Sequence, residues 1–144
     1  MKPTPDLVLN HAFAKIAMEM GPALPPGYGQ GSATLVGVLL LMVGQEFNRA
    51  ADIRAKENAA MRALFGEAAG KGGVALSSRL KKAAGESDPD LNVATLDRAN
   101  GELKALLIEL QAHAEESGDR TLATRILAFL RDAAAARQVF LPAM

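Results

Sequence analysis

The sequence contains no cysteine and no tryptophan, and aromatic residues make up only 4% of its 144 residues. The absence of cysteine excludes disulfide bonds, thiolate metal sites and cysteine nucleophiles. The formal net charge is zero, from 16 basic and 16 acidic residues. Nucleic-acid-binding proteins usually combine a basic stripe with accessible aromatic side chains. We therefore expect no nucleic-acid partner.

Long apolar runs are also missing. The strongest run covers residues 33–43, in which Thr34 is the only polar residue. A membrane-spanning helix needs about 20 such residues, and this run ends in the polar sequence GQEFNRAAD, so we expect no membrane partner. The N-terminal sequence lacks the charged region and long apolar region of a signal peptide. The expected location is the cytoplasm.

Helix-forming residues are what the sequence has in quantity. Alanine, leucine, glutamate, lysine and arginine dominate, and β-branched residues never alternate over the length of a strand. The hydrophobic fraction of 49% and the charged fraction of 22% suit one compact domain over residues 1–144. We predict an all-α fold, an antiparallel helical bundle of four main helices plus one short helix around a long apolar second helix.

Capping residues and glycine-rich breaks give the expected helix boundaries. Thr4 and Ser32 are suitable N-caps for the first two helices, Asp88 or Asp90 suits the fourth, and Pro142 would stop the last. The expected helices are 5–20, 32–69, 74–84, about 90–116 and 120–140. Apolar stripes at three- and four-residue spacing run along the first, fourth and last of them: Leu9, Phe13, Ile16 and Met20; Leu96, Ala99, Leu103, Leu106 and Leu110; and Leu122, Ile126, Phe129, Ala133, Ala136 and Phe140.

The second helix has no polar side between Leu35 and Val43. Such a segment must be enclosed by protein, either its own bundle or a second subunit. The helix would be about 54 Å long, whereas a compact domain of this size is only roughly 37 Å across. It should therefore kink at Gly44 or project and pair with a partner, and Gly37 and Gly44 would permit close helix approach. We expect a homodimer.

Candidate site residues come from the second and fourth helices and from one loop. A helical projection places Glu46 and Glu57 on an apolar stripe, where a carboxylate is costly unless it is paired or coordinated. Tyr28 lies in a glycine-rich run that we interpret as a tight reversal, because no strand precedes it as in a phosphate-binding loop. His113 lies at the edge of the fourth-helix stripe, with Glu109 four residues before it.

Two interpretations of these residues stay open. A carboxylate-bridged metal bundle uses two Glu-x-x-His motifs. In this chain Glu109-x-x-x-His113 is one residue too long and has no second copy. The metal candidates Glu46, Glu57, Glu109 and His113 therefore match such a site in residue type but not in spacing. The alternative is structural: Glu57 and Arg54 pair with neighbours, and His113 is a satisfied histidine at the bundle rim. The charged side chains expected on the opposite, solvated side of the second helix are Arg49, Asp52, Lys56 and Arg62.

Two functional hypotheses follow. The first is a non-enzymatic interaction protein that oligomerises through its apolar helix surface. The second is a helical-bundle enzyme, or a carrier of a small ligand or metal, with a pocket between helices formed by Glu46, Glu57 and His113 near Tyr28. The sequence assigns no catalytic residue and no cofactor, so it does not decide whether the protein is an enzyme.

Overall fold

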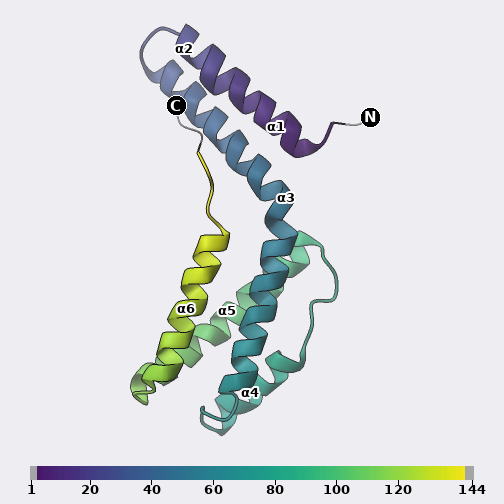
Figure 1. The fold of residues 1–144 in the computed structure, drawn as a ribbon, viewed down its shortest axis with the longest axis vertical. Helices are drawn as coiled ribbons and strands as arrows, with labels where there is room; N and C mark the ends of the chain where they lie inside the picture. Colours follow the sequence, from purple (N-terminus) through teal and green to yellow (C-terminus); the bar gives the residue numbers. More distant parts are fainter. Residues whose placement is uncertain (1–2, 142–144) are drawn as a thin grey trace. The chain divides into compact units, whose positions relative to one another are not determined.

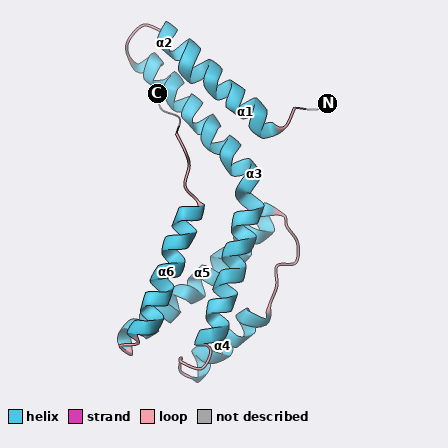
Figure 2. Cartoon of the chain, in the orientation of Figure 1, coloured by secondary structure: helices cyan, strands magenta, loops and turns pink. Residues whose placement is uncertain are grey.

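The computed structural model describes residues 3–141, and these residues form an all-α fold (Figures 1 and 2). The predicted helical-bundle class is confirmed, and no strand is present in the described range. In chain order the elements are α1 (Pro5–Phe13), the π-helical segment η1 (Ala14–Met20), α2 (Gly21–Ala23), α3 (Tyr28–Ala68), α4 (Val74–Gly85), α5 (Val93–Glu116) and α6 (Arg120–Ala136).

The chain divides into two compact units. Unit 1 contains residues 3–50 together with 139–141, and unit 2 contains residues 51–138. Helix α3 contributes its first part to unit 1 and the remainder to unit 2. Each unit has its own cluster of buried apolar residues, and the expectation of a single domain over residues 1–144 stays a prediction.

Unit 1 is a helical hairpin in which α1, η1 and α2 run back along the first part of α3 (Figure 1). Two glycines of α3 make this contact possible. A Cβ atom built on Gly37 would lie 2.5 Å from the Cβ of Ala17, and one built on Gly44 would lie 3.2 Å from the Cβ of Leu9. Both distances are shorter than ordinary van der Waals contact. The predicted close approach at these glycines is confirmed, and the helix that approaches is the chain's own first helix.

Segment η1 changes which residues of the first helix face α3. The N–H of Gly21 donates to the carbonyl of Ile16, five residues earlier, which is a wider turn than that of an α-helix. The buried positions are consequently Phe13, Ala17 and Gly21. The prediction that Met20 continues the apolar stripe is wrong, because the wider turn rotates this side chain outward, where it is exposed.

Helix α3 begins at Tyr28 and not at the predicted cap, Ser32. Gly27 has a φ of 146°, a conformation that favours glycine, and the chain reverses there. The N–H of Gly31 then donates to the carbonyl of Gly27 at 3.2 Å. Most of the glycine-rich run is therefore helical, and Ser32 lies inside the helix.

Unit 2 is built around one apolar core to which α3, α4, α5 and α6 all contribute. The predicted stripe of the fourth helix is confirmed along its leucine residues. The stripe of the last helix is confirmed only in the first half of α6, and its continuation to Ala136 and Phe140 is wrong, because both residues are exposed. The buried stripe residues are Leu96, Leu103, Leu106 and Leu110 on α5 and Leu122 and Ile126 on α6. Facing them from α3 and α4 are Met61, Phe65 and Leu80, which are fully buried.

The N-terminus of α5 is capped by Asn92, whose side-chain oxygen accepts a hydrogen bond from the N–H of Ala94 at 2.9 Å. The prediction of Asp88 or Asp90 as the cap is wrong. Asp90 instead accepts from the backbone N–H of Asn92 at 2.8 Å and fixes the turn before the helix. Asp88 is engaged with side chains of α3.

Helix α6 ends at Ala136, short of the predicted end at Phe140. The backbone of Phe140 is held by the side chain of Gln45, also in unit 1: its N–H donates to Oε1 at 3.0 Å and its carbonyl accepts from Nε2 at 2.7 Å. A side-chain amide therefore takes the bonds that a last helical turn would have used. Pro142, the predicted stop, lies outside the described residues.

Candidate functional sites

One side of α3 in unit 1 carries a row of exposed apolar side chains. The opposite side, with Gly37, Leu41 and Gly44, is buried. The exposed residues, which we call the apolar face, have exposed fractions between 39% and 60%: Leu35, Val36, Leu39, Met42, Val43 and Phe47. Within unit 1, the rest of the hairpin covers only one side of this part of α3, because a single neighbouring helix cannot surround another.

The apolar face is large for a surface feature. A fully exposed large apolar side chain presents on the order of 150–200 Å², so six side chains that are about half exposed offer roughly 500 Å². The largest apolar patches of monomeric proteins measure about 300–600 Å² and are often functional. The surrounding sequence is also uncharged, since no Asp, Glu, Lys, Arg or His occurs from Met20 to Gln45. This surface is suited to contact with another apolar surface.

Tyr28 and Glu46, two of the predicted ligand residues, both belong to unit 1. Tyr28 is the first residue of α3 and is 93% exposed, so its ring covers no part of the hairpin. Glu46 lies between Val43 and Phe47, the last two residues of the apolar face, and it is half-buried.

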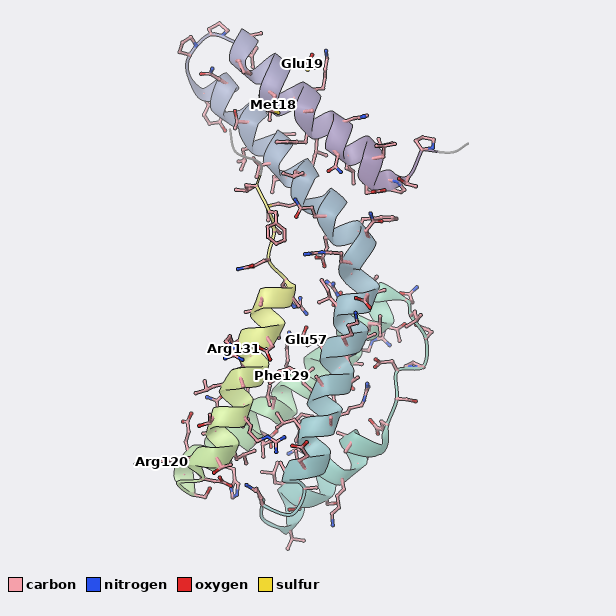
Figure 3. All side chains as sticks on the ribbon, in the orientation of Figure 1. Met18, Glu19, Glu57, Arg120, Phe129 and Arg131 are labelled. Carbon is pink, nitrogen blue, oxygen red and sulfur yellow. The ribbon has the colours of Figure 1, made fainter. Side chains whose placement is uncertain are left out.

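Glu57 lies on α3 in unit 2 (Figure 3), and its carboxylate is paired from two sides. Lys104 Nζ lies 2.8 Å from Oε1, and Arg137 Nε donates to Oε2 at 3.1 Å. The side chain is only 4% exposed. The pairing predicted for Glu57 and for Arg54, which pairs with Asp97, is confirmed, and it joins α3 to α5 and to the end of α6.

These partners control the ionisation of Glu57. Burial acts to raise the pKa of the Glu57 carboxyl, but the hydrogen bonds and positive charges of Lys104 and Arg137 outweigh burial and hold that pKa below its usual value. Glu57 is therefore a paired anion at neutral pH. A carboxylate held in this way is a structural tie and a poor general base.

His113 and Glu109 point to separate partners. The Nε2 atom of His113 lies 2.8 Å from the carbonyl oxygen of Lys71, and because a carbonyl only accepts, this nitrogen carries the proton. Glu109 accepts two hydrogen bonds from Arg79 at 2.6 and 2.8 Å, which lower the pKa of Glu109. His113 thus ties the α3–α4 turn to α5, and Glu109 ties α4 to α5.

A buried amide network in unit 2 was not predicted. Asn58 on α3 is fully buried, and its Nδ2 atom donates to the Leu96 carbonyl at 3.2 Å and to both Asp88 oxygens at 3.2 and 3.3 Å. Its Oδ1 atom accepts from Asn100 on α5 at 2.8 Å. Arg62 completes the network through Nη2, which lies 2.7 Å from Asp88.

The amide network corrects the prediction for Arg62, and one residue of the sequence, Asn100, indicated that a buried network exists. Arg62 was predicted on the solvated side, but it is bound to Asp88 and its side chain is only 12% exposed. The hydrogen bond from Arg62 lowers the pKa of the Asp88 carboxyl, burial of Asp88 raises it, and the net effect is a lowered pKa. The signal was Asn100, which falls four residues after Leu96 and three before Leu103 in an otherwise apolar stripe. A helix-interior amide at such a position needs a buried partner.

Unit 2 also contains an open groove of about 510 Å³ between α4 and α5. Leu103, Leu106, Ala83 and Ala99 supply its apolar lining, and its cations are Arg62, Arg79, Lys82 and Arg98. Glu86 and Glu102 line the same groove, while Asp88 and Glu109 neutralise Arg62 and Arg79. Positive and negative charges therefore balance, and none of Tyr28, Glu46, Glu57 or His113 lines this groove.

Within residues 3–141, no three His, Cys, Asp or Glu side chains are grouped closely enough to hold a metal ion. In the same range, no helix combines the length and apolar character needed to cross a bilayer. Comparison of the chain with protein-family models, curated proteins and solved structures finds no match.

Proposed function

We propose that this chain is a non-enzymatic oligomerising protein and that a second copy of the chain covers the apolar face of α3. The observation that carries the proposal is the half-exposed row from Leu35 to Phe47 on the side of α3 opposite α1. Exposure of this row to water is unfavourable by about 25 cal/mol for each Å². Burial against a like surface removes that cost from both chains.

The area available supports a second copy as the occupant. Two apolar faces of roughly 500 Å² each would bury about 1,000 Å² in total, which reaches the lower size limit of a specific interface. The surface is self-complementary in chemistry, since apolar side chains meet apolar side chains and no charge lies between Leu35 and Val43. A two-fold dimer uses the same patch on both subunits.

Sedimentation of the full chain over a concentration series tests this proposal. We expect a dimer at micromolar concentration and a shift to monomer in Leu39→Glu, because a carboxylate buried in an apolar interface is strongly unfavourable. The dissociation constant of the variant should rise by about 100-fold or more. Ile108→Glu is the matched control, since Ile108 is a 69% exposed apolar residue on α5, and this variant should remain dimeric.

Three results would contradict the proposal. The first is a monomeric parent chain at high concentration, and the second is a Leu39→Glu variant that dimerises as tightly as the parent. The third is a monomer that sediments with lipid vesicles, which would assign the apolar face to a lipid surface. The cytoplasmic location and the alternative of a ligand or metal carrier stay predictions from the sequence.

A further inference from the structure

The apolar face has a centre and two unlike ends. Leu39 lies at its middle, with Leu35 and Val36 about one turn before it and Met42 and Val43 about one turn after it. The C-terminal end carries Phe47, with Glu46 beside it. The first turns of α3 carry Gly29, Gly31 and Ser32 after the exposed Tyr28, so one end is bulky and charged, whereas the other is uncharged and has small residues after Tyr28.

The small end is open. Apart from its two chain neighbours, a Cβ atom built on Gly29 or on Gly31 would meet no atom of the described residues within 4 Å. Gly29 and Phe47 are eighteen residues apart, which is five full helical turns. They therefore lie on the same line along α3, equally far from a point next to Leu39.

We infer that the second copy packs antiparallel on the apolar face, with the two-fold axis close to Leu39. This inference rests on the dimer proposed above. Antiparallel pairing brings Leu35 of each copy opposite Val43 of the other and places the ring of Phe47 over the open backbone at Gly29. At each end of the interface a Phe47 ring then packs over the open backbone at Gly29, which gives the shape complementarity that a small interface requires.

Cysteine cross-linking distinguishes the two orientations, and the chain is suited to it because it contains no cysteine of its own. The variants are Leu35→Cys, Leu39→Cys and Val43→Cys in the full chain, each checked by sedimentation before mild oxidation. In an antiparallel pair the two copies of residue 35 lie eight residues apart along the helix, about 12 Å, which is beyond disulfide reach. The two copies of residue 39 lie close to the axis.

The expected pattern is specific. Leu39→Cys should form covalent dimers alone, whereas Leu35→Cys and Val43→Cys should do so only after the two variants are mixed and allowed to exchange subunits. The mixture should exceed either single variant by roughly tenfold, because disulfide formation requires Cα atoms within about 7 Å. An Ile108→Cys variant measures random collisional cross-linking.

Each other outcome has a separate meaning. If all three single variants cross-link equally and mixing adds nothing, the pair is parallel, and the orientation is overturned while the dimer survives. If the variants sediment as dimers but cross-link no better than Ile108→Cys, the apolar face is not the interface, and the orientation is overturned with it. If the parent chain is monomeric, the proposed function itself fails.

Discussion

Units 1 and 2 are both helical, yet they differ in how completely they bury their apolar residues. Among the described residues, the core of unit 2 contains thirteen buried residues from four helices and one turn, whereas that of unit 1 contains three, namely Phe13, Ala17 and Leu41. In unit 2 the buried side chains of Asn58 and Glu57 are also paired. Two helices in contact bury one stripe each, and a third surface is needed to cover the rest. The comparison shows that four helices of unit 2 enclose its core, whereas one side of α3 in unit 1 is exposed.

The largest expected effect concerns the buried amide network of unit 2. Asn58→Ala leaves the buried Leu96 carbonyl, the buried Asn100 amide and the partly buried Asp88 carboxylate each without one partner. We expect the free energy of unfolding to fall by about 2–4 kcal/mol, measured by urea denaturation followed by circular dichroism. Gln111→Ala, which removes an amide bonded only to the exposed side chain of Glu115, should change stability by less than about 0.5 kcal/mol. Equal effects of the two variants would show that unit 2 does not depend on its polar core.

The next effect concerns the helix contact of unit 1. Gly37→Ala places a methyl group 2.5 Å from the Cβ of Ala17, so the two helices must separate, and we expect a loss of about 1–3 kcal/mol. Gly31→Ala is the matched control on the same helix, where the added methyl group meets nothing. It should stabilise α3 by up to about 1 kcal/mol, because alanine favours the helix.

Thermal unfolding of the two glycine variants provides the measurement. Opposite signs for Gly37→Ala and Gly31→Ala would support a tight contact between η1 and α3. A stabilised Gly37→Ala variant would mean that η1 is not held against α3, and the contrast between the two sides of α3 in unit 1 would lose its basis.

The smallest effect concerns the paired carboxylate of unit 2. Glu57→Gln removes the charge that Lys104 and Arg137 share, and both cations retain access to water, since their side chains are 42% and 36% exposed. We expect a loss of about 1–2 kcal/mol at neutral pH. Lys56→Gln, on the exposed surface of the same helix, should change little.

The pH dependence of this difference has a defined sign. The pKa of Glu57 is lower in the folded chain than its ordinary value of 4.5, so the ionised form stabilises the fold above about pH 4.5. That contribution is lost as the pH falls below 4.5 through the lowered pKa. The difference in unfolding free energy between the parent chain and Glu57→Gln should therefore shrink in acid. A difference that grows in acid would contradict the pairing.

Helix positions were predictable to the extent that local signals decide them. Glycine-rich breaks and apolar spacing placed α4, α5 and the start of α6 within a few residues. The errors occur where a distant group intervenes. The end of α6 was displaced because the backbone of Phe140 pairs with Gln45, ninety-five residues away in sequence, and no local pattern records such a pair.

The candidate site was predictable only in part, for a related reason. A helical projection shows that Glu57 faces inward, and burial of a carboxylate requires a partner, so its pairing followed from chemistry. The identity of the partners depends on how α5 and α6 pack. The prediction for Arg62 was wrong for the same reason. On an isolated helix this side chain faces water, and it is buried only where Asp88 packs against it.

The Gln45–Phe140 pair has a consequence for the order of events during synthesis. Ninety-five residues separate the two partners, and at about 5–20 residues per second a ribosome needs roughly 5–20 seconds to make them. During that interval the apolar face of the hairpin is exposed, and Phe140, which binds Gln45, has not yet been translated. Neighbouring ribosomes on one message present the same surface at the same time, which gives nascent chains an opportunity to meet before either is finished.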